Sequence, residues 1–539
     1  MSLGTDTNPA PAAAGAPRTR ARGAAALVAL GILLSRIAGL VRQRVFAHYF
    51  ANSAAAGAFT AALRIPNFLQ NLFGEGALSA SFIPVYAGLL ARADDEEAGR
   101  VAGAIGALLA LSMAALVLVG VLGTPWLVDF IAPGFEGGTR ALTIRLVRIL
   151  FPGVGLLVLS AWCLGILNSH RQFFLSYAAP VVWNAAMIAA LVAFGSGSNQ
   201  EQLAVALAWG AVVGSVLQFA VQVPAVLRLA TRLRPALDTT SVHVRTVLRN
   251  FLPAFVSRGV VQISAFVDSI LASLISASAV AALGYAQPIY TLPVSLFGLS
   301  VSAAELPAMA SAVGSEGEIA AHLRRRLNDG LQRISFFVVP SATALFALGD
   351  VIAGALYQTG RFGRADAEWV WGILAGSAIG LLASTLGRLY SSAYYALRDT
   401  RTPLRFAFVR VALTTALGYA LAVAVPPALG LDPKWGVAGL TASAGVAGWV
   451  EFVLLRRSMN ARIGATGVRP RHAAVLWAAA GAAAAAAWAV KLALGPRHPL
   501  ISAGATLGVY ALVYGGITSA SGVREARLVL ARLTRRPGR

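Results

Sequence analysis

A chain of 539 residues that is 57% hydrophobic and only 12% charged is not an ordinary water-soluble protein, in which about 25% of residues are charged. Its apolar runs recur from end to end, are rich in Ala, Leu, Val and Gly and lack strict alternation, so they predict membrane-spanning helices and exclude a barrel. The net charge of +22 fits loop arginines that orient a membrane protein better than a nucleic-acid surface, and the single cysteine, Cys163, excludes disulfides and cysteine metal clusters.

Fourteen apolar segments are each long enough to form a transmembrane helix. At about 1.5 Å of rise per residue, roughly 20 residues cross the hydrocarbon core of a bilayer. The sequence therefore predicts an all-α polytopic membrane protein. The expected helices lie near residues 25–48, 55–90, 97–128, 139–168, 173–195, 201–230, 245–276, 279–312, 317–347, 365–396, 403–425, 435–460, 471–493 and 499–519.

Basic residues gather in every second connection between these helices. They include Arg92, Arg100, His170, Arg171, the residues from Arg228 to Arg249, Arg324 to Arg326, Arg398 to Arg405 and Arg456 to Arg471. The other connections are mostly short and poor in base, for example residues 51–54 and 276–279. The exceptions are Arg361, Arg364, Lys491 and Arg497. Because Lys and Arg mark cytoplasmic connections, we expect an even number of helices and both termini in the cytoplasm.

Both ends of the chain lie outside the apolar segments. Residues 1–23 are rich in Pro and Ala and contain Arg18, Arg20 and Arg22, so we expect a disordered cytoplasmic tail ahead of an uncleaved first helix. Residues 521–539 are predicted to form a basic cytoplasmic tail.

The sequence also repeats itself. The letters LFG at residues 72–74, followed by Pro84, return at residues 296–298, followed by Pro307. A second internal similarity relates ILNSHRQFFLSYAAP, across the fourth and fifth helices, to YALRDTRTPLRFAF, across the tenth and eleventh. The offset spans six helices and predicts two parallel six-helix bundles, as in many transporters that bind cargo between their halves. The predicted units are residues 24–235, 236–462 and, outside the repeat, 463–520 with helices 13 and 14.

Five charged residues occupy the apolar stretch from Leu34 to Pro84. They are Arg36, Arg42, Arg44, Arg64 and Glu75. A charge at the centre of a spanning helix costs at least about 2.5–3.5 kcal/mol, so a group of them favours a water-filled cationic cavity. The alternative for Arg36 is snorkelling to the cytoplasmic surface, and for Arg44 anchoring at the outer surface.

The chain resembles the MurJ/MviN family in a series of short stretches that begins in this segment. The matching stretches are SRIAGLVRQ, RIPN, LFGEGALSASFIPVY, APGF, GILN and the second-half LP…LFG…LP. They lie in the family's order from the first helix to the twelfth. The family comprises lipid II flippases of the multidrug/oligosaccharidyl-lipid/polysaccharide exporter superfamily.

The resemblance implies a fold, a cargo and a location. It implies fourteen helices, a V-shaped central cavity between the two bundles and a hydrophobic groove formed by helices 13 and 14. It implies that alternating access moves lipid II from the inner to the outer leaflet of the bacterial cytoplasmic membrane, for cell-wall synthesis. The expected partners are lipid II, membrane lipids and a coupling ion, either sodium or a proton. We expect no cofactor, no nucleic acid and a monomer.

The family's charged positions transfer only in part. Arg36 and Arg42 match its first-helix arginines, Arg64 matches a basic residue and Glu75 matches an acid in the second helix. Departures occur where the family has other polar or charged residues. These positions carry Gln43, Gly57, Gln70, Pro288 and Thr291, with Pro288 replacing a cavity arginine.

Three more charged residues within predicted helices are candidates for the site. Arg258, nine residues past Arg249 and about 13 Å along its helix, is a candidate replacement for the cation missing at Pro288; the alternative is a structural pairing. Asp268, a candidate for coupling, matches an acid that some relatives use to bind sodium, although their partner ligands are lacking here; the alternatives are that Asp268 neutralises an arginine or carries a proton. Glu305 is a second candidate for coupling or gating, together with Glu75.

Two other functions stay open on the sequence. The same fold could export another polyprenyl-pyrophosphate-linked glycan or a drug, but a cationic drug calls for acids where arginines prevail here. A non-transporting scaffold is disfavoured by the buried charges, and an enzyme by the absence of catalytic motifs.

Overall fold

The computed structural model describes residues 18–311, 313–495 and 497–534, without the side chains of residues 18–29, 74–75, 254, 256–265 and 532–534. The described part is helical and contains no strand. Its elements are α1 (Arg18–Phe50), α2 (Ala54–Leu69), η1 (Gln70–Leu78), α3 (Ser79–Ala91), α4 (Asp95–Leu122), α5 (Thr124–Ile131), α6 (Gly137–Ser169), α7 (Phe173–Phe194), α8 (Gln200–Leu229), α9 (Val242–Ile275), α10 (Ala277–Pro293), η2 (Val294–Leu299), α11 (Ser300–Ala310), α12 (Glu316–Tyr357), α13 (Arg364–Ala396), α14 (Arg401–Tyr419), η3 (Ala420–Ala424), α15 (Val425–Ala428), η4 (Pro433–Trp435), α16 (Gly436–Ile463), α17 (Pro470–Leu494), α18 (Pro499–Ala520) and α19 (Arg524–Thr534).

Twelve helices in the described residues are long and apolar enough to cross a membrane. The chain is therefore a multi-pass membrane protein. The long helices α1 and α9 lie at the first and seventh predicted positions but are not among the twelve. The count of fourteen spans thus stays a prediction.

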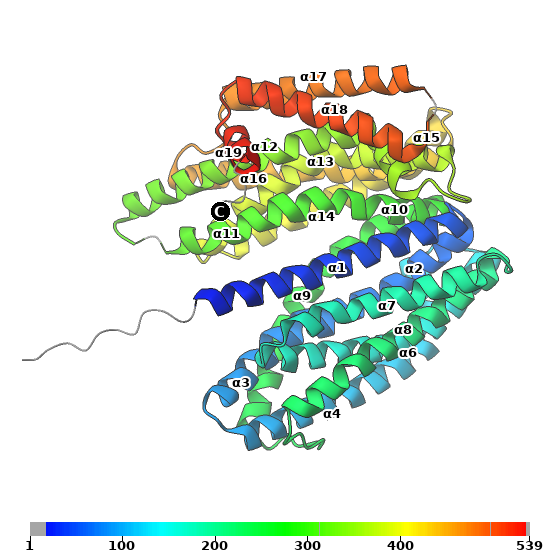
Figure 1. Ribbon diagram of the computed structural model, residues 1–539, viewed down its shortest axis with the longest axis vertical. Coiled ribbons are helices and arrows are strands. Elements are labelled where there is room, and N and C mark those ends of the chain that lie inside the picture. Colours follow the sequence, from blue (N-terminus) through cyan, green and yellow to red (C-terminus); the bar gives the residue numbers. More distant parts are fainter. Residues whose placement is uncertain (1–17, 312, 496, 535–539) are drawn as a thin grey trace, which may run out of the picture.

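The helices form two bundles, seen as the lower and upper halves of Figure 1. In the first bundle α1 packs on α7, α2 on α6, α4 on α6, and α8 on both α6 and α7. In the second bundle α9 packs on α14, α10 on α13, α12 on α13, and α16 on both α13 and α14. The helices of the second bundle thus meet in the same order as those of the first.

The helix α9 crosses from one bundle to the other. Its first half packs on α3 and η1, with the Phe255 ring 4.8 Å from that of Phe73, while its later residues contact α10, α14 and α16. The ring of Phe266, further along α9, lies 5.2 Å from that of Phe68 on α2. This crossing places the apolar end of α9 at the boundary between the bundles.

Both copies of the LFG sequence lie in π-helical turns. Residues 72–74 fall within η1 and residues 296–298 within η2, each flanked by α-helix. Pro66, Pro288 and Pro293 lie within the preceding α2 and α10, and a proline cannot donate the usual backbone hydrogen bond. Wide turns inside helices are common at functional sites, and these two occupy matching places in the two bundles.

The bundles are tied together at one end, which we call the closed end. Here the Tyr285 hydroxyl donates to the Ala51 carbonyl over 2.8 Å, and the Asn52 amide donates to Asp366 over 3.0 Å. The Arg44 guanidinium donates to the carbonyls of Ala355 and Leu356. At the opposite end, where α1 begins and α19 lies, the bundles diverge in Figure 1, and α11 packs on its own neighbours α12, α13 and η2.

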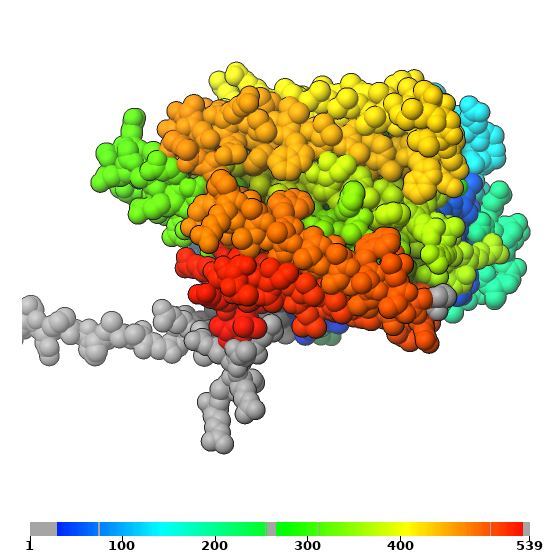
Figure 2. Space-filling view, turned by 90° about the horizontal axis from the view of Figure 1, so that it is seen from above, coloured from blue at the N-terminus to red at the C-terminus, as the bar shows by residue number. Residues whose placement is uncertain are grey.

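Two helices cover the outside of the second bundle. Both α17 and α18 pack on each other and on α12, and Figure 2 shows them along one face of the molecule. A 2.6 Å ion pair between Lys491 and Asp350 fixes α17 to α12. Neither Asp350 nor Lys491 lines the cavity between the bundles that is described below.

Several predicted boundaries differ from the structure. The ninth predicted helix, placed at 317–347, extends to Tyr357 because α12 bends at Leu348 and then continues. The third predicted helix, placed at 97–128, is divided at Gly123 into α4 and α5. The first helix begins at Arg18, inside the predicted tail, and α19 lies within the predicted C-terminal tail.

Candidate functional site

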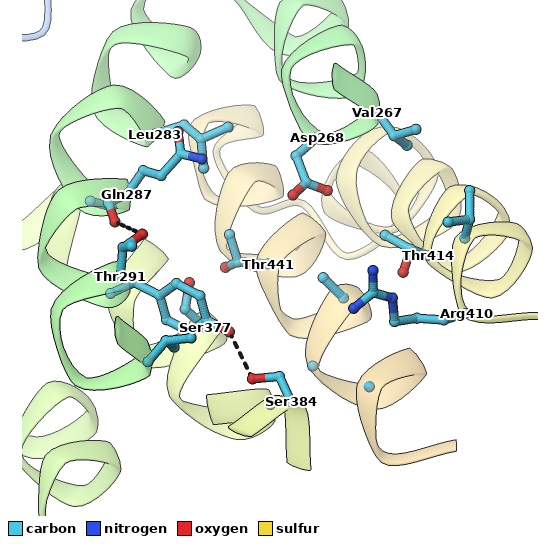
Figure 3. Close-up of a pocket in the computed structure, with 18 of the residues that line it drawn as sticks. Val267, Asp268, Leu283, Gln287, Thr291, Ser377, Ser384, Arg410, Thr414 and Thr441 are labelled. Carbon is cyan, nitrogen blue, oxygen red and sulfur yellow. Dashed lines mark hydrogen bonds between the residues drawn. The ribbon is translucent and has the colours of Figure 1, made fainter. Parts of the chain in front are cut away.

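A cavity of about 410 Å³ lies at the boundary between the bundles. Its wall is formed by α2 from the first bundle, by the end of α9, and by α10, α13, α14 and α16 from the second. Figure 3 shows its side chains converging from separate helices. Ligand pockets in proteins typically measure about 300–1,000 Å³, so a small polar group fits.

Four charged side chains line this cavity: Arg64, Asp268, Arg388 and Arg410. They come from α2, α9, α13 and α14 respectively. Three guanidinium groups against one carboxylate give the wall an excess of positive charge. Within a membrane such an excess is costly unless water or an anion fills the space.

The charges are held apart across the cavity. Asp268 interacts electrostatically with Arg64 and Arg410, yet it forms no ion pair within 4.0 Å in the described residues. Figure 3 shows the Asp268 carboxylate and the Arg410 guanidinium pointing into the same space. Arg410 has a direct partner on its other side, since its Nη1 lies 3.4 Å from Oε2 of Glu451 on α16.

Neutral polar groups complete the wall. The hydroxyls of Tyr290 and Ser384 share a hydrogen bond of 3.2 Å, and the Thr291 hydroxyl donates to the Gln287 carbonyl over 2.8 Å. Thr441, on α16, donates to the carbonyl of Ile373 on α13. These bonds satisfy the hydroxyl donors internally, so their oxygens remain able to accept hydrogen bonds from water or cargo.

Small residues let two wall helices approach closely. A Cβ added to Gly380 of α13 would lie 2.3 Å from the Cα of Gly445 on α16. This backbone contact fixes α13 against α16, and with them Arg388 and the Glu451 partner of Arg410.

The structure brings two of the sequence-predicted site residues into the cavity. Arg64 and Asp268 line it from opposite bundles. Arg36 is exposed on α1. Arg42 packs against α7, where its guanidinium lies 5.1 Å from the Trp183 ring centre and 3.6 Å from the Met187 sulfur.

Glu305 lies within the second bundle and away from the cavity wall. Only 5% of its surface is exposed, and it forms ion pairs with Arg326 at 3.7 Å and Arg333 at 3.4 Å. These contacts connect α11 to α12. The side chains of Glu75 and Arg258 lie outside the described residues, so their predicted roles are not compared with the structure.

The sequence interpretation missed Arg388 and Arg410. Arg410 follows Arg401, the first residue of α14, by nine residues, which places it about 13 Å along the helix. Arg258 was selected because it lies about 13 Å along its helix from a basic residue near the start of that helix, and the same reasoning would have selected Arg410. Glu451 of α16, the ion-pair partner of Arg410, was likewise not among the predicted site residues.

No cluster of three or more His, Cys, Asp or Glu side chains suited to a metal ion occurs in the described part of the chain. Thr414 of α14 and Thr441 of α16 line the same cavity as Asp268. A sodium ion at Asp268 therefore stays a prediction.

Comparison with known proteins gives a consistent result. Residues 46–498 match the family model described as lipid II flippase MurJ. A lipid II flippase MurJ of Burkholderia cenocepacia is 31% identical over 437 residues, covering 80% of this chain and 82% of that protein. A probable lipid II flippase MurJ of Rhizobium tropici is 32% identical, covering 78% of this chain and 77% of that protein.

The fold has a matching solved structure. The lipid II flippase MurJ in an inward closed conformation superimposes with a TM-score of 0.72 and 24% sequence identity. The match covers 92% of this chain and 100% of that one. At this identity the likeness establishes the shared arrangement of helices.

Proposed function

This chain belongs to the lipid II flippase MurJ family, and we propose that it moves lipid II from the inner to the outer leaflet of the bacterial inner membrane. A flippase is a transporter and not an enzyme. Its cargo supplies peptidoglycan synthesis, so the protein serves cell-wall construction.

The observation that carries the proposal is the cationic cavity between the bundles. Arg64, Arg388 and Arg410 line one space, and an arginine binds a phosphate through two parallel hydrogen bonds. A pyrophosphate that enters a membrane needs such donors to replace its water. We therefore assign the pyrophosphate of the cargo to these three guanidinium groups.

The second bundle supplies its cations from α13 and α14 in this chain. Pro288 occupies the α10 position at which the resemblance led us to expect an arginine, and its neighbour Gln287 lines the cavity. Arg388 and Arg410 reach the same cavity from the adjoining helices. We propose that they supply the charge expected at Pro288, together with the predicted substitute Arg258.

The remaining predicted residues keep proposed roles. Arg36 and Arg42 attract the anionic headgroup toward the cavity, with Arg258 as a further cation of the site. Glu75 and Glu305 are gating or coupling residues. For Glu305 the support is its pairing with two α12 arginines, which lets α11 and α12 move as one unit.

We propose that transport proceeds by alternating access. Fourteen spans would form two parallel six-helix bundles (24–235 and 236–462) around a V-shaped cavity, and the repeated order of helix contacts supports this plan. The bundles, joined at the closed end, would rock to join at the opposite end. The polyprenyl tail would stay in lipid beside α17 and α18, the protein would act as a monomer, and the membrane potential or a sodium or proton gradient would drive it.

A bacterial depletion strain tests the proposal. The chain replaces the resident lipid II flippase, and outer-leaflet lipid II is measured with a leaflet-accessibility assay. We expect the wild-type chain to restore outward exposure and growth. Arg388→Ala and Arg410→Ala should each lower cargo affinity roughly 10- to 100-fold, since a hydrogen bond to a charged group contributes about 1.5–3 kcal/mol.

The matched control is Arg405→Ala. Arg405 is exposed, lies on α14 with Arg410 and is not part of the cavity wall. It should support normal exposure of lipid II at equal protein levels. If outer-leaflet lipid II stays the same on depletion and on re-expression of the wild-type chain, the flippase function is rejected. If Arg388→Ala and Arg410→Ala both support normal exposure of lipid II, the proposed pyrophosphate site is rejected.

A further inference from the structure

Asp268 is the acid that lines the cavity in the described part of the chain. It is half-buried and has no hydrogen bond or ion pair within 4.0 Å there. Three other acids of the second bundle differ: Glu305, Asp350 and Glu451 each have a basic partner within this distance. An unpaired carboxylate facing open space in a membrane protein calls for a functional explanation.

Asp268 lies close enough to both bundles to interact with a charge from each. It interacts electrostatically with Arg64 of the first bundle and with Arg410 of the second. Because it lies on α9, the helix that crosses between the bundles, its charge acts at their boundary. The open gap between it and the arginines is where the proposed pyrophosphate would sit.

The charge balance of the cavity explains why an acid belongs there. With no cargo, the three arginines exceed the two nearby acids, Asp268 and the Glu451 partner of Arg410, by one positive charge, and an excess charge in a membrane is costly. A fixed carboxylate offsets part of that cost. It also repels a phosphate, so the affinity for cargo falls when the carboxylate is present.

Building on the proposed function, we propose that Asp268 is a built-in counter-anion that competes with the cargo's pyrophosphate for Arg64 and Arg410. It stabilises the empty cavity and keeps pyrophosphate binding weak enough for release. When cargo enters, its phosphates take over the two guanidinium groups. When cargo leaves, Asp268 compensates them again, so the empty protein can return to its starting conformation.

A binding measurement on the full-length chain tests this inference. The chain is placed in nanodiscs of uncharged lipid and titrated with geranylgeranyl pyrophosphate, with geranylgeraniol as the probe that lacks phosphate. Asp268→Asn and Asp268→Ser should each bind the pyrophosphate about tenfold more tightly, because repulsion is removed. Asp268→Glu keeps the charge and should bind as the wild type does.

Two controls separate a charge effect from a change in folding. Asp350→Asn neutralises an acid of α12 that pairs with Lys491 away from the cavity, and it should leave the affinity unchanged. In an Arg64→Ala/Arg410→Ala chain, adding Asp268→Asn should raise affinity by clearly less than the tenfold gain in the wild-type background, because only the direct repulsion between carboxylate and phosphate remains to be removed. A purely structural role for Asp268 would not disappear with those arginines.

Transport gives the second readout. In the depletion strain, Asp268→Asn should bind cargo more tightly and yet export it more slowly, because release becomes limiting. Pyrophosphate binding that is unchanged or weaker in both neutral variants would overturn the inference and leave the arginine site standing. A wild-type chain that binds the pyrophosphate no better than the alcohol would overturn the site itself and the inference with it.

Discussion

The two arginines that looked most alike in the sequence have different surroundings. Arg42 and Arg64 both interrupt apolar helices, and both were expected at the cavity. Arg64 lines it, whereas Arg42 lies over the Trp183 ring with its guanidinium 3.6 Å from the Met187 sulfur. A guanidinium on an indole face, shielded from water, contributes up to about 2 kcal/mol to stability. Arg42 therefore connects α1 to α7 whatever part it takes in binding.

This contact predicts a stability effect at Arg42. Arg42→Ala should lower the free energy of unfolding by about 1–2 kcal/mol, and Trp183→Leu should lose the same coupling in a double-mutant cycle. Thermal melting of the purified chain in detergent measures both. Arg36→Ala is the control, because Arg36 is exposed on the same helix and should change stability by less than about 0.5 kcal/mol. Equal melting of the two Arg variants would contradict the packing role.

At the scale of elements, contact between the bundles at the closed end depends on how closely the backbones of α2 and α10 can approach each other. A Cβ added to Gly57, near the start of α2, would lie 1.9 Å from the carbonyl oxygen of Ala277, the first residue of α10. A rigid backbone atom cannot move aside as a flexible side chain can. The lack of a side chain at Gly57 is therefore what lets the first and second bundles meet here.

A side chain at Gly57 should force the closed end apart. Overpacking costs about 1–3 kcal/mol, so Gly57→Val should shift the population away from this conformation roughly tenfold or more. The reporter is a cysteine at Ala279, which is fully buried, in a Cys163→Ser chain, and the measurement is its rate of maleimide labelling. The matched control is Gly88→Val, because Gly88 lies in a helix with open space around it. Slow labelling in both variants would show that the closed end tolerates the side chain.

At the scale of the whole molecule, the arginine-rich connections predict a direction across the membrane. The closed end carries the turn between α7 and α8, and the Gln200 side chain beside this turn donates to the carbonyls of Tyr49 and Phe50. The connection before α9 lies at the other end, where Ser241 donates to Glu97 over 2.6 Å. By the positive-inside rule we predict that the second end faces the cytoplasm.

Cysteine labelling in intact cells tests this orientation. Ser196→Cys, in the exposed turn between α7 and α8, should react with a membrane-impermeant maleimide added from outside. Thr239→Cys, exposed in the connection before α9, should react only after lysis. The native Cys163 is fully buried and should give no background. Outside labelling at Thr239→Cys alone would reverse the orientation.

The residue order by itself determined the helical membrane architecture and the family. Apolar run length, the charge of each connection and local motifs are properties of neighbouring residues, so they can be read along the chain. The boundaries were less accurate at Leu348 and Gly123, because neither the bend nor the division interrupts the apolar run with a long polar break. At the second point the sequence does offer a local signal that the prediction did not use, since Gly123 is followed two residues later by Pro125.

Which of the charged side chains meet depends on how the helices pack. Arg64, Asp268, Arg388 and Arg410 lie on four helices that are far apart in sequence, and helix packing alone brings them to one cavity. The same packing directs Arg42 to Trp183 and pairs Glu451 with Arg410. The sequence of a membrane-spanning helix shows which charged residues it contains. The direction in which each charged side chain points depends on which neighbouring helices pack against the other faces of that helix.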